Sequence, residues 1–300
     1  MGRPELRSHS RTPSPRRTAR AATLALGVGA VLTLSGCSDT LKHGFLPYGP
    51  DVAVDNDRII NLWNGSWIAA LVVGVLVWGL IIWSVVVYRR RRDDAVLPPQ
   101  VRYHLPLEIM YTIVPLMMVG VLFFYTARDQ SELLSLEKTP DLTVGVVAKQ
   151  WSWDFNYVNA DVYETGVMGE LDGGKGIEKE LPTLWLPVNK RVQFNLTSRD
   201  VIHSFWIPAF LRKMDTIPGV ENSFQVVPTQ IGTYKGKCAE LCGEYHSAML
   251  FNVKVVSQAD YDAHVAALRA AGQTGSLPTD LGRSKLPVDP GHAEEAGVNQ

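Results

Sequence analysis

The stretch Cys238-Ala-Glu-Leu-Cys242-Gly-Glu-Tyr-His246-Ser-Ala-Met249 places two thiols, an imidazole and a thioether within twelve residues. Thiolate and thioether are soft ligands that favour copper, and imidazole binds the same metal. Zinc sites rarely use methionine. His203, in Val-Ile-His-Ser-Phe, precedes this stretch and would supply a second imidazole if the fold brings it close. Two cysteines and two histidines could then hold a pair of copper ions.

The two motifs together resemble a known family. C-x-E-x-C-x3-H-x2-M with the upstream V-x-H-S-[FW]-x2-P is similar to the binuclear Cu-A site of cytochrome c oxidase subunit II, in the bacterial lipoprotein form found in aa3-type haem-copper oxidases. The resemblance extends from about Trp63 to Val256. It implies a two-helix transmembrane hairpin followed by an all-β cupredoxin-like sandwich.

The resemblance also implies a ligand set. Cys238 and Cys242 would bridge both coppers in a Cu2S2 core. His203 and Met249 would complete one copper, and His246 with the backbone carbonyl of Glu240 would complete the other. In the family, the side chain of Glu240 would also reach a magnesium ion shared with subunit I.

The cysteine count leaves one competing interpretation of the motif. The chain has three cysteines, of which two lie in the copper motif and the third is Cys37. In an oxidising exported compartment, Cys238 and Cys242 could instead form a disulfide with each other. The adjacent His246 and Met249 favour the metal site over that disulfide.

The amino-terminal segment has the layout of a secretory signal. Several arginines precede an apolar run from Ala21 to Leu34, and small residues follow directly before Cys37. This order resembles the bacterial lipobox and predicts a signal peptide over 1–36, with lipidation of Cys37 at the mature amino terminus. The alternative is an ordinary free or buried cysteine. Residues 37–62 would form an exported segment.

Two apolar runs predict a membrane hairpin over 63–128. The runs, at about 66–88 and 107–126, are long enough as helices to cross a hydrocarbon core of about 30 Å. Arg89 to Arg92 and Arg102 lie in the connection, so the positive-inside rule places that connection in the cytoplasm. The chain is thus expected in a bacterial plasma membrane with its β domain outside. A buried hairpin of a soluble protein is the alternative.

Short β-rich runs predict a small antiparallel sandwich or barrel over 129–257. A Gly-rich insertion interrupts it at about 164–180, where five glycines fall between strands. The last segment, 258–300, is expected to form a helix to Ala271 and a mobile tail beyond Gly272. The predicted strands are 142–148, 151–158, 184–186, 191–196, 223–227 and 249–256.

The resemblance assigns electron entry to Trp151, which lies in Gln-Trp-Ser-Trp at the start of a strand. The family more often has W-Y-W here, and Ser152 departs from that pattern. A buried core tryptophan is the alternative, and Trp153 is expected to be one. Asp200 and Asp215 match family acids near the face that docks the electron donor, although either could be a solvated surface acid.

Two further acids stand out in the sequence. Asp154 has no counterpart among the family's functional residues. Glu108 matches the acid at the cytoplasmic mouth of the oxidase K proton pathway, because an ionisable group inside a span is costly enough to suggest a function. Glu108 lies only two residues past Pro106, so its carboxylate could equally reach the interface by snorkelling.

The predicted function is electron entry. The chain would accept electrons from a cytochrome c, or from a membrane-bound cytochrome c domain of a bc-type complex, and pass them to haem a of subunit I for the reduction of oxygen to water. Expected partners are subunits I and III and membrane lipids. Nucleic acid is not expected, and the net charge of −1 agrees with this. The alternatives are a membrane-anchored copper chaperone and a copper-free quinol oxidase subunit II.

Overall fold

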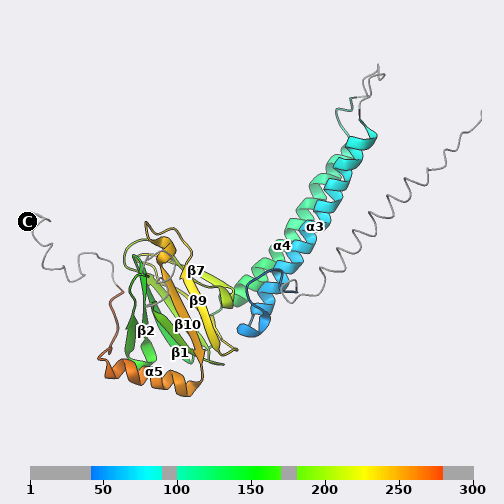
Figure 1. Ribbon diagram of the computed structural model, residues 1–300. Helices are drawn as coiled ribbons and strands as arrows, with labels where there is room; N and C mark the ends of the chain where they lie inside the picture. Colours follow the sequence, from blue (N-terminus) through cyan, green and yellow to red (C-terminus); the bar gives the residue numbers. More distant parts are fainter. Residues whose placement is uncertain (1–41, 90–99, 170–180, 280–300) are drawn as a thin grey trace, which may run out of the picture. The chain divides into compact units, whose positions relative to one another are not determined.

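The computed structural model describes residues 42–89, 100–169 and 181–279. Its helices and strands lie in the compact unit Leu46–Gln300 and begin with a short 3-10 helix, η1 (Pro50–Val52). Two long helices come next, and β-strands occupy most of the remaining chain (Figure 1). The predicted signal peptide and Cys37 lie outside the described residues.

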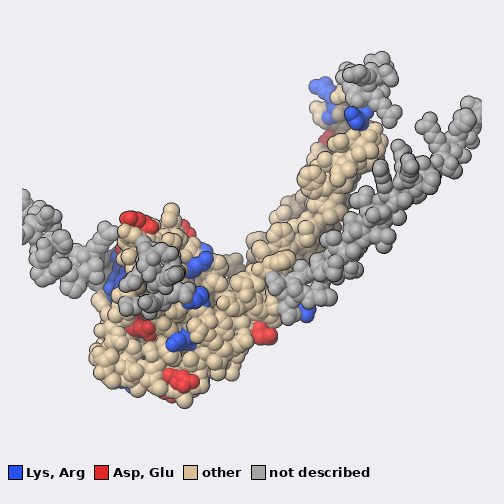
Figure 2. Space-filling view, in the orientation of Figure 1, with Lys and Arg blue, Asp and Glu red and all other residues tan. Residues whose placement is uncertain are grey.

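The hairpin consists of α3 (Asn56–Val87) and α4 (Leu105–Leu133). Both helices are long and apolar enough to cross a membrane, and their most apolar segments are not buried within the chain. Figure 2 shows the hairpin surface as almost entirely uncharged, with Lys and Arg side chains at the end where α3 and α4 are connected. Arg89 and Arg102 are exposed there, as the positive-inside argument requires.

The helices extend beyond the predicted spans. α3 begins at Asn56 and α4 ends at Leu133, whereas the apolar runs begin at Ser66 and end at Thr126. The additional turns contain charged residues such as Asp57, Arg58 and Asp129, so an uncharged apolar run does not include them. The Arg58 guanidinium lies 3.5 Å from the Asp129 carboxylate, which joins the two helices in these extra turns. The helical hairpin therefore begins earlier and ends later in the chain than the predicted range 63–128.

Ten strands form a β-sandwich, as predicted. One five-stranded sheet has the order β3-β2-β1-β5-β8, and the other has the order β4-β10-β9-β6-β7. The expectation of a purely antiparallel fold was wrong, because β1 pairs with β5 and β4 pairs with β10 in parallel. Periodicity is the same for both directions, so the sequence pattern could not separate them. The strands are β1 (Leu142–Lys149), β2 (Ser152–Tyr157), β3 (Val162–Thr165), β4 (Thr183–Pro187), β5 (Val192–Ser198), β6 (His203–Ile207), β7 (Arg212–Thr216), β8 (Asn222–Val226), β9 (Gly232–Cys238) and β10 (Leu250–Val256).

All six predicted strands are present, with ends shifted by a few residues. The six ranges leave out β3, β6, β7 and β9. The first three are only four or five residues long and give a weak alternating signal. β9 contains two glycines, which weaken the strand signal. Short 3-10 helices occupy several of the connections: η2 (Val158–Ala160), η3 (Pro208–Phe210) and η4 (His246–Ala248).

Aromatic side chains fill the space between the sheets. Trp153 is fully buried and packs edge-on against Phe205 and Phe251, whose rings stack with centroids 5.0 Å apart. Burying side chains of this size stabilises a domain by about 1.5–3 kcal/mol each. The prediction that Trp153 serves packing is confirmed, and this aromatic layer provides a rigid base for the loops at one end of the sandwich.

The carboxyl-terminal part differs from the prediction in one respect. α5 (Gln258–Ala270) matches the expected helix. The expectation of a mobile tail directly beyond Gly272 was wrong, because the next residues are hydrogen-bonded to the sandwich. The Asn156 side chain binds both the N–H and the C=O of Leu277, and Thr274 bridges to Val162. The sequence shows only polar and Gly-Pro composition here, which does not reveal such contacts.

The Gly-rich insertion also begins later than predicted. Glu164 and Thr165 belong to β3, and the Glu164 carboxylate accepts a hydrogen bond from the N–H of Thr183. Residues 170–180 of the insertion lie outside the described residues.

Candidate metal centre

Three neighbouring strands bring the predicted ligands to one end of a sheet. β9 ends at Cys238 and β6 begins at His203, and these strands pair with Phe205 opposite Cys238. β10 begins just after Met249 and pairs back onto β9. The chain between β9 and β10 therefore forms a closed loop. All six predicted ligands lie in that loop or on the adjoining strand end.

The donor atoms lie close together. The Cys238 and Cys242 sulfurs are 3.8 Å apart, and the Met249 sulfur is 3.8 Å from that of Cys242. His203 Nδ1 lies 3.9 Å from the Cys238 sulfur, and His246 Nδ1 lies 3.5 Å from the Cys242 sulfur. The structure thus brings together two thiols, two imidazole nitrogens and a thioether. The outermost of these ligands in the sequence, His203 and Met249, are 46 positions apart.

The backbone carbonyl oxygen of Glu240 completes the cluster. It lies 3.2 Å from the Cys238 sulfur. Glu240 also borders a hollow of about 670 Å³, which Asp215, Leu241, Cys242 and Gly243 line as well.

The two cysteines are free thiols. Their 3.8 Å separation is nearly twice a disulfide bond length of about 2.05 Å. Both side chains are buried, and Met249 is fully buried beside them. A soft, largely water-free donor set with two imidazoles fits copper by ligand chemistry. His203, Cys238 and Cys242 alone place ligand atoms within 4.8 Å of one another, which is compact enough for a metal ion.

The thiols differ in how readily they ionise. Burial opposes ionisation of Cys238, but hydrogen bonds with His203 and with the backbone lower its pKa to about 6. Burial and the adjacent Cys238 sulfur raise the pKa of Cys242 to about 12. The pair therefore releases its first proton easily and holds its second, as coupled groups do. A bound cation would favour loss of both protons, because thiolates are the ligating form.

Asp200 orients one of the imidazoles. Its carboxylate lies 2.7 Å from His203 Nε2 and also accepts hydrogen bonds from the N–H groups of Gln150 and Val201. Burial raises the pKa of Asp200, but these bonds outweigh it and lower the pKa. Burial lowers the pKa of His203, but the interactions led by the hydrogen bond to Asp200 outweigh it, so the pKa is raised. With Nε2 bound to Asp200, Nδ1 is the nitrogen that faces the sulfurs.

The two predicted docking acids have different surroundings. The Asp200 side chain is only 12% exposed, and His203 and backbone groups occupy its oxygens. The Asp215 side chain is 43% exposed and lies 3.2 Å from the Lys213 ammonium. The Ser204 hydroxyl on the paired strand and the Lys213 ammonium keep the pKa of Asp215 below its usual value. Of the two acids, Asp215 has the surface that a docking role needs.

Trp151 lies against the loop that carries the cysteines. Its ring packs edge-on against Tyr245, with centroids 4.7 Å apart. A side chain at Gly243 would meet the Trp151 indole at 3.1 Å, and Gly243 has a positive φ of 127°, so glycine is required there on two grounds. The neighbouring Gln150 donates from Nε2 to the carbonyl of Cys242 at 2.8 Å. Trp151 is thus half-buried and in contact with the chain between two ligands.

Sequence reasoning missed several supporting residues. Gln150 and Tyr245 contact Trp151 or the cysteine loop, and no local signal marks either of them. Asp154 is fully buried and pairs with Lys149 at 2.7 Å and with Arg199 at 3.5 Å. Lys149 and Arg199 directly precede Gln150 and Asp200. An aspartate between two large aromatic residues, Trp153 and Phe155, was the only signal that could have indicated this network.

Glu108 lies far along the chain from this cluster and caps α4. Its carboxylate accepts a hydrogen bond from the N–H of His104 at 3.0 Å, while His104 Nδ1 accepts one from the N–H of Leu107. This reciprocal arrangement resembles a capping box and satisfies free N–H groups at the helix start. In the structure, the Glu108 side chain therefore helps to cap the amino-terminal end of α4.

Fold and site define a class of protein: a β-sandwich of cupredoxin type whose loops carry a candidate soft-metal site, following two apolar helices that could span a membrane. A family model for the cytochrome c oxidase subunit II periplasmic domain matches residues 142–256. The chain is 48% identical to the probable cytochrome c oxidase subunit 2 of Streptomyces avermitilis, covering 90% of this chain and 94% of the relative. It is 37% identical to the Mycobacterium leprae protein of that name, covering 83% and 84%.

The chain belongs to the cytochrome c oxidase subunit II family. The homologues bear the name of the second subunit of cytochrome c oxidase, which is an oxidoreductase. Among solved structures, the periplasmic domain of subunit II (CoxB) of Bradyrhizobium japonicum aligns with a TM-score of 0.42 and 30% identity, over 45% of this chain and 97% of that one.

Proposed function

We propose that this chain is the Cu-A electron-entry subunit of a cytochrome c oxidase, which accepts electrons singly from a cytochrome c haem and passes them to haem a of subunit I. The observation that carries the proposal is the convergence of five donor side chains and one carbonyl oxygen on a common centre, with sulfur–sulfur distances of 3.8 Å. Oxygen reduction would take place in subunit I.

Two copper ions would share the six ligands. Cys238 and Cys242 would bind both ions, His203 and Met249 would bind one, and His246 and the Glu240 carbonyl would bind the other. A bound copper pair would supply reversible one-electron chemistry, with the charge shared between two metals. The donor set supports this assignment because each further ligand group lies next to one of the two sulfurs.

The protein's contribution would be to keep this ligand set in place. Asp200 holds His203 through Nε2, and paired strands fix both ends of the cysteine loop. Ligands that cannot rearrange favour fast one-electron transfer. All six groups come from the protein, so the site would act as a relay and not as a substrate site.

Electron entry would occur at Trp151. Its indole contacts Gly243 and Tyr245, which lie between the ligands Cys242 and His246. A half-exposed aromatic ring offers a flat contact for a haem edge. Asp215, and to a smaller extent Asp200, would steer a basic donor surface toward this face. The proposal also includes contact with subunit III and a magnesium ion near Glu240. Glu108 would take part in the K proton pathway.

The chain would be anchored in a bacterial plasma membrane. α3 and α4 would span it, with the β-sandwich on the outer side, and Cys37 would carry a lipid. Mass spectrometry of the mature amino terminus tests the anchor: a diacylglyceryl-modified Cys37 is expected, and an unmodified peptide that continues upstream of Cys37 would reject it.

Two rivals are less well supported. A copper-free quinol oxidase subunit would not need the complete set of soft ligands. A thiol copper chaperone would be expected to have a thioredoxin-like βαβ pattern, whereas the described strands form two packed sheets.

Copper counting and electron paramagnetic resonance on the full-length protein test the proposal. We expect two coppers per chain and a seven-line mixed-valence spectrum. Cys242→Ser should abolish that spectrum, and Cys37→Ser, which changes the cysteine outside the motif, should keep it. A single copper per chain, or a reducible disulfide between Cys238 and Cys242, would contradict the proposal.

A further inference from the structure

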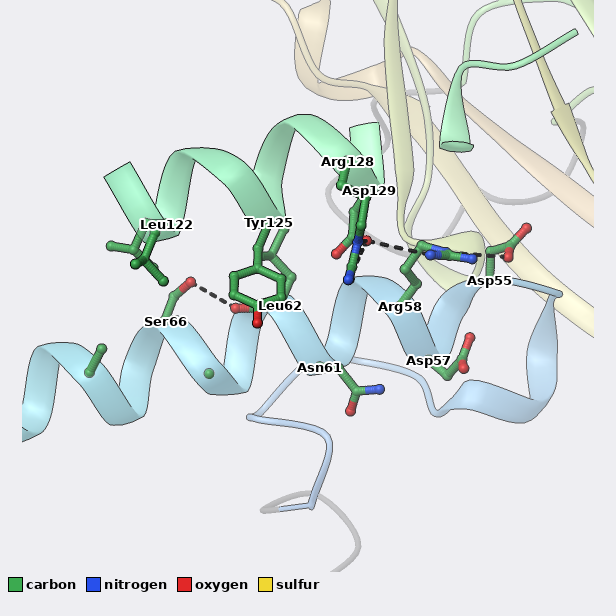
Figure 3. Close-up of a pocket in the computed structure, with 13 residues that line it drawn as sticks. Asp55, Asp57, Arg58, Asn61, Leu62, Ser66, Leu122, Tyr125, Arg128 and Asp129 are labelled. Atoms are coloured by element: carbon green, nitrogen blue, oxygen red, sulfur yellow. Dashed lines mark hydrogen bonds and ion pairs between the residues drawn. The ribbon is translucent and has the colours of Figure 1, made fainter. Parts of the chain in front are cut away.

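A hollow of about 610 Å³ lies along the groove between α3 and α4, near the end of the hairpin where α3 begins and α4 ends (Figure 3). It is separate from the metal centre, and every lining residue belongs to the hairpin or to the residue that precedes α3. By the proposed orientation, this end of the hairpin lies at the outer surface of the membrane.

The hollow is charged at one end and apolar at the other. Figure 3 shows Arg58, Arg128 and Asp129 gathered at one end, whereas Leu122 lies farther along the groove. Leu62 and Val121 also line it. A groove of this kind, at the level where two spanning helices leave the hydrocarbon core, matches a molecule with a polar head and an apolar chain.

The charges at the polar end are of both signs. Arg58 and Arg128 share the Asp129 carboxylate, at 3.5 and 2.8 Å. One carboxylate cannot saturate two guanidiniums, which carry five N–H donors each. The Arg58 Nε is buried and lies 3.7 Å from the Asp55 carboxylate, whereas half of the Arg128 side chain is exposed. Donors therefore remain for a phosphate, which guanidinium groups bind well.

Acidic groups balance these cations. Asp55 and Asp57 also line the hollow. Asp55 is already paired with Arg58 at 3.7 Å and with Arg212 at 4.0 Å. Asp57 is exposed and has no ion-pair partner among the described residues, so its carboxylate would repel a purely anionic headgroup. A headgroup that carries a phosphate and an ammonium can satisfy both the arginines and the acids.

We propose that this hollow binds one zwitterionic phospholipid of the outer leaflet, with its phosphate at Arg58 and Arg128, its ammonium toward the Asp55 and Asp57 side, and an acyl chain along Leu62 and Leu122. The leaflet assignment rests on the proposed membrane orientation. The lipid-binding chemistry depends only on the hairpin and does not require copper.

Gly65 leaves room for the acyl chain. It lines the hollow, and a Cβ atom added at this position would have no atom within 4 Å. A leucine at this position would therefore fill the hollow without displacing the protein. Gly79, in the same helix, is equally free of neighbours and does not line the hollow. Gly79→Leu is thus a matched control for Gly65→Leu.

The test is native mass spectrometry of the full-length chain released from nanodiscs made of equal parts phosphatidylethanolamine and phosphatidylglycerol. We expect one retained phosphatidylethanolamine per chain. Gly65→Leu displaces the apolar part and Arg128→Gln removes a phosphate contact, so each should lower retention about tenfold. Gly79→Leu should retain lipid like the unchanged chain.

Three results would overturn the proposal. These are equal retention by Gly65→Leu and Gly79→Leu, a preference for phosphatidylglycerol, and a structure of the whole oxidase in which a segment of another subunit fills the groove. Copper content, measured on the same samples, tests the proposed electron-entry function separately, because none of these variants changes a metal ligand. A failure of the lipid proposal is thus distinguishable from a failure of the copper proposal.

Discussion

Replacing the buried Asp154 by asparagine should destabilise the β-sandwich more than a change of charge to amide at an exposed position does. The carboxylate is completely buried, with Lys149 at 2.7 Å and Arg199 at 3.5 Å. It also accepts hydrogen bonds from Thr165 at 2.7 Å and from the N–H of Gly166 at 3.2 Å. Asparagine can keep one of these acceptor roles, but it leaves two cations without a counter-charge.

The magnitude follows from the burial of the partners. Removing one partner of a fully buried ion pair costs about 3–5 kcal/mol. The Lys149 and Arg199 side chains are 25% and 16% exposed, so water compensates part of that loss. We therefore expect Asp154→Asn to lower the free energy of unfolding by about 2–4 kcal/mol. With a urea dependence of about 1–3 kcal/mol per molar, the midpoint should fall by about 1–2 M.

Urea unfolding of the full-length chain in detergent micelles measures this change, with tryptophan fluorescence, to which the buried Trp153 contributes, as the signal. Asp161→Asn is the matched control. It removes an exposed aspartate charge near the same sheet edge, at a φ of 51° that asparagine tolerates. The control should change stability by less than about 0.5 kcal/mol. If Asp154→Asn has an equally small effect, the ion network does not support this part of the fold.

Three further predictions concern other parts of the protein. Trp151→Phe should slow reduction by cytochrome c about tenfold while copper content and spectrum stay unchanged, and an unaltered stopped-flow rate would reject Trp151 as the entry residue. Asn156→Ala removes two hydrogen bonds to Leu277, so the free energy of unfolding should fall by about 1–2 kcal/mol and amide hydrogen exchange over 273–277 should accelerate. Unchanged exchange would show that other contacts hold this segment. Burial, aided by Asp262, raises the pKa of Tyr261 to about 12 in the folded protein, whereas the unfolded chain has a pKa of about 10. Between about pH 10 and 12 the unfolded chain loses this proton and the folded protein keeps it, so the stability of the fold should decline over that range. Tyr261→Phe should weaken the decline.

The hairpin and the sandwich were predictable because their signals are local. Apolar runs longer than a bilayer core and arginines at one end can be recognised without any tertiary contact. Alternating strands such as β5, whose residues are buried and half-buried in turn, are equally local. The antiparallel expectation failed at β1–β5 and β4–β10, because strand direction depends on how the connections run and not on the pattern within a strand.

The ligand set was predictable for a different reason. Five of the six predicted ligands fall within a single loop, so their spacing is itself a signal, and only His203 had to be brought in from elsewhere. Asp200 appeared in sequence as a surface acid near the donor. Its bond to His203 Nε2 depends on the turn between β5 and β6, which a residue pattern does not describe.

The sequence by itself determined the kind of chemistry, because soft ligands at fixed spacing select a metal, and it determined the membrane hairpin, because hydropathy is additive along the chain. Only the tertiary structure decided which groups support that chemistry. Asp154, Gln150 and Gly65 acquire their roles from residues far away in the chain. Such long-range contacts arise from packing, and neither composition nor periodicity contains them.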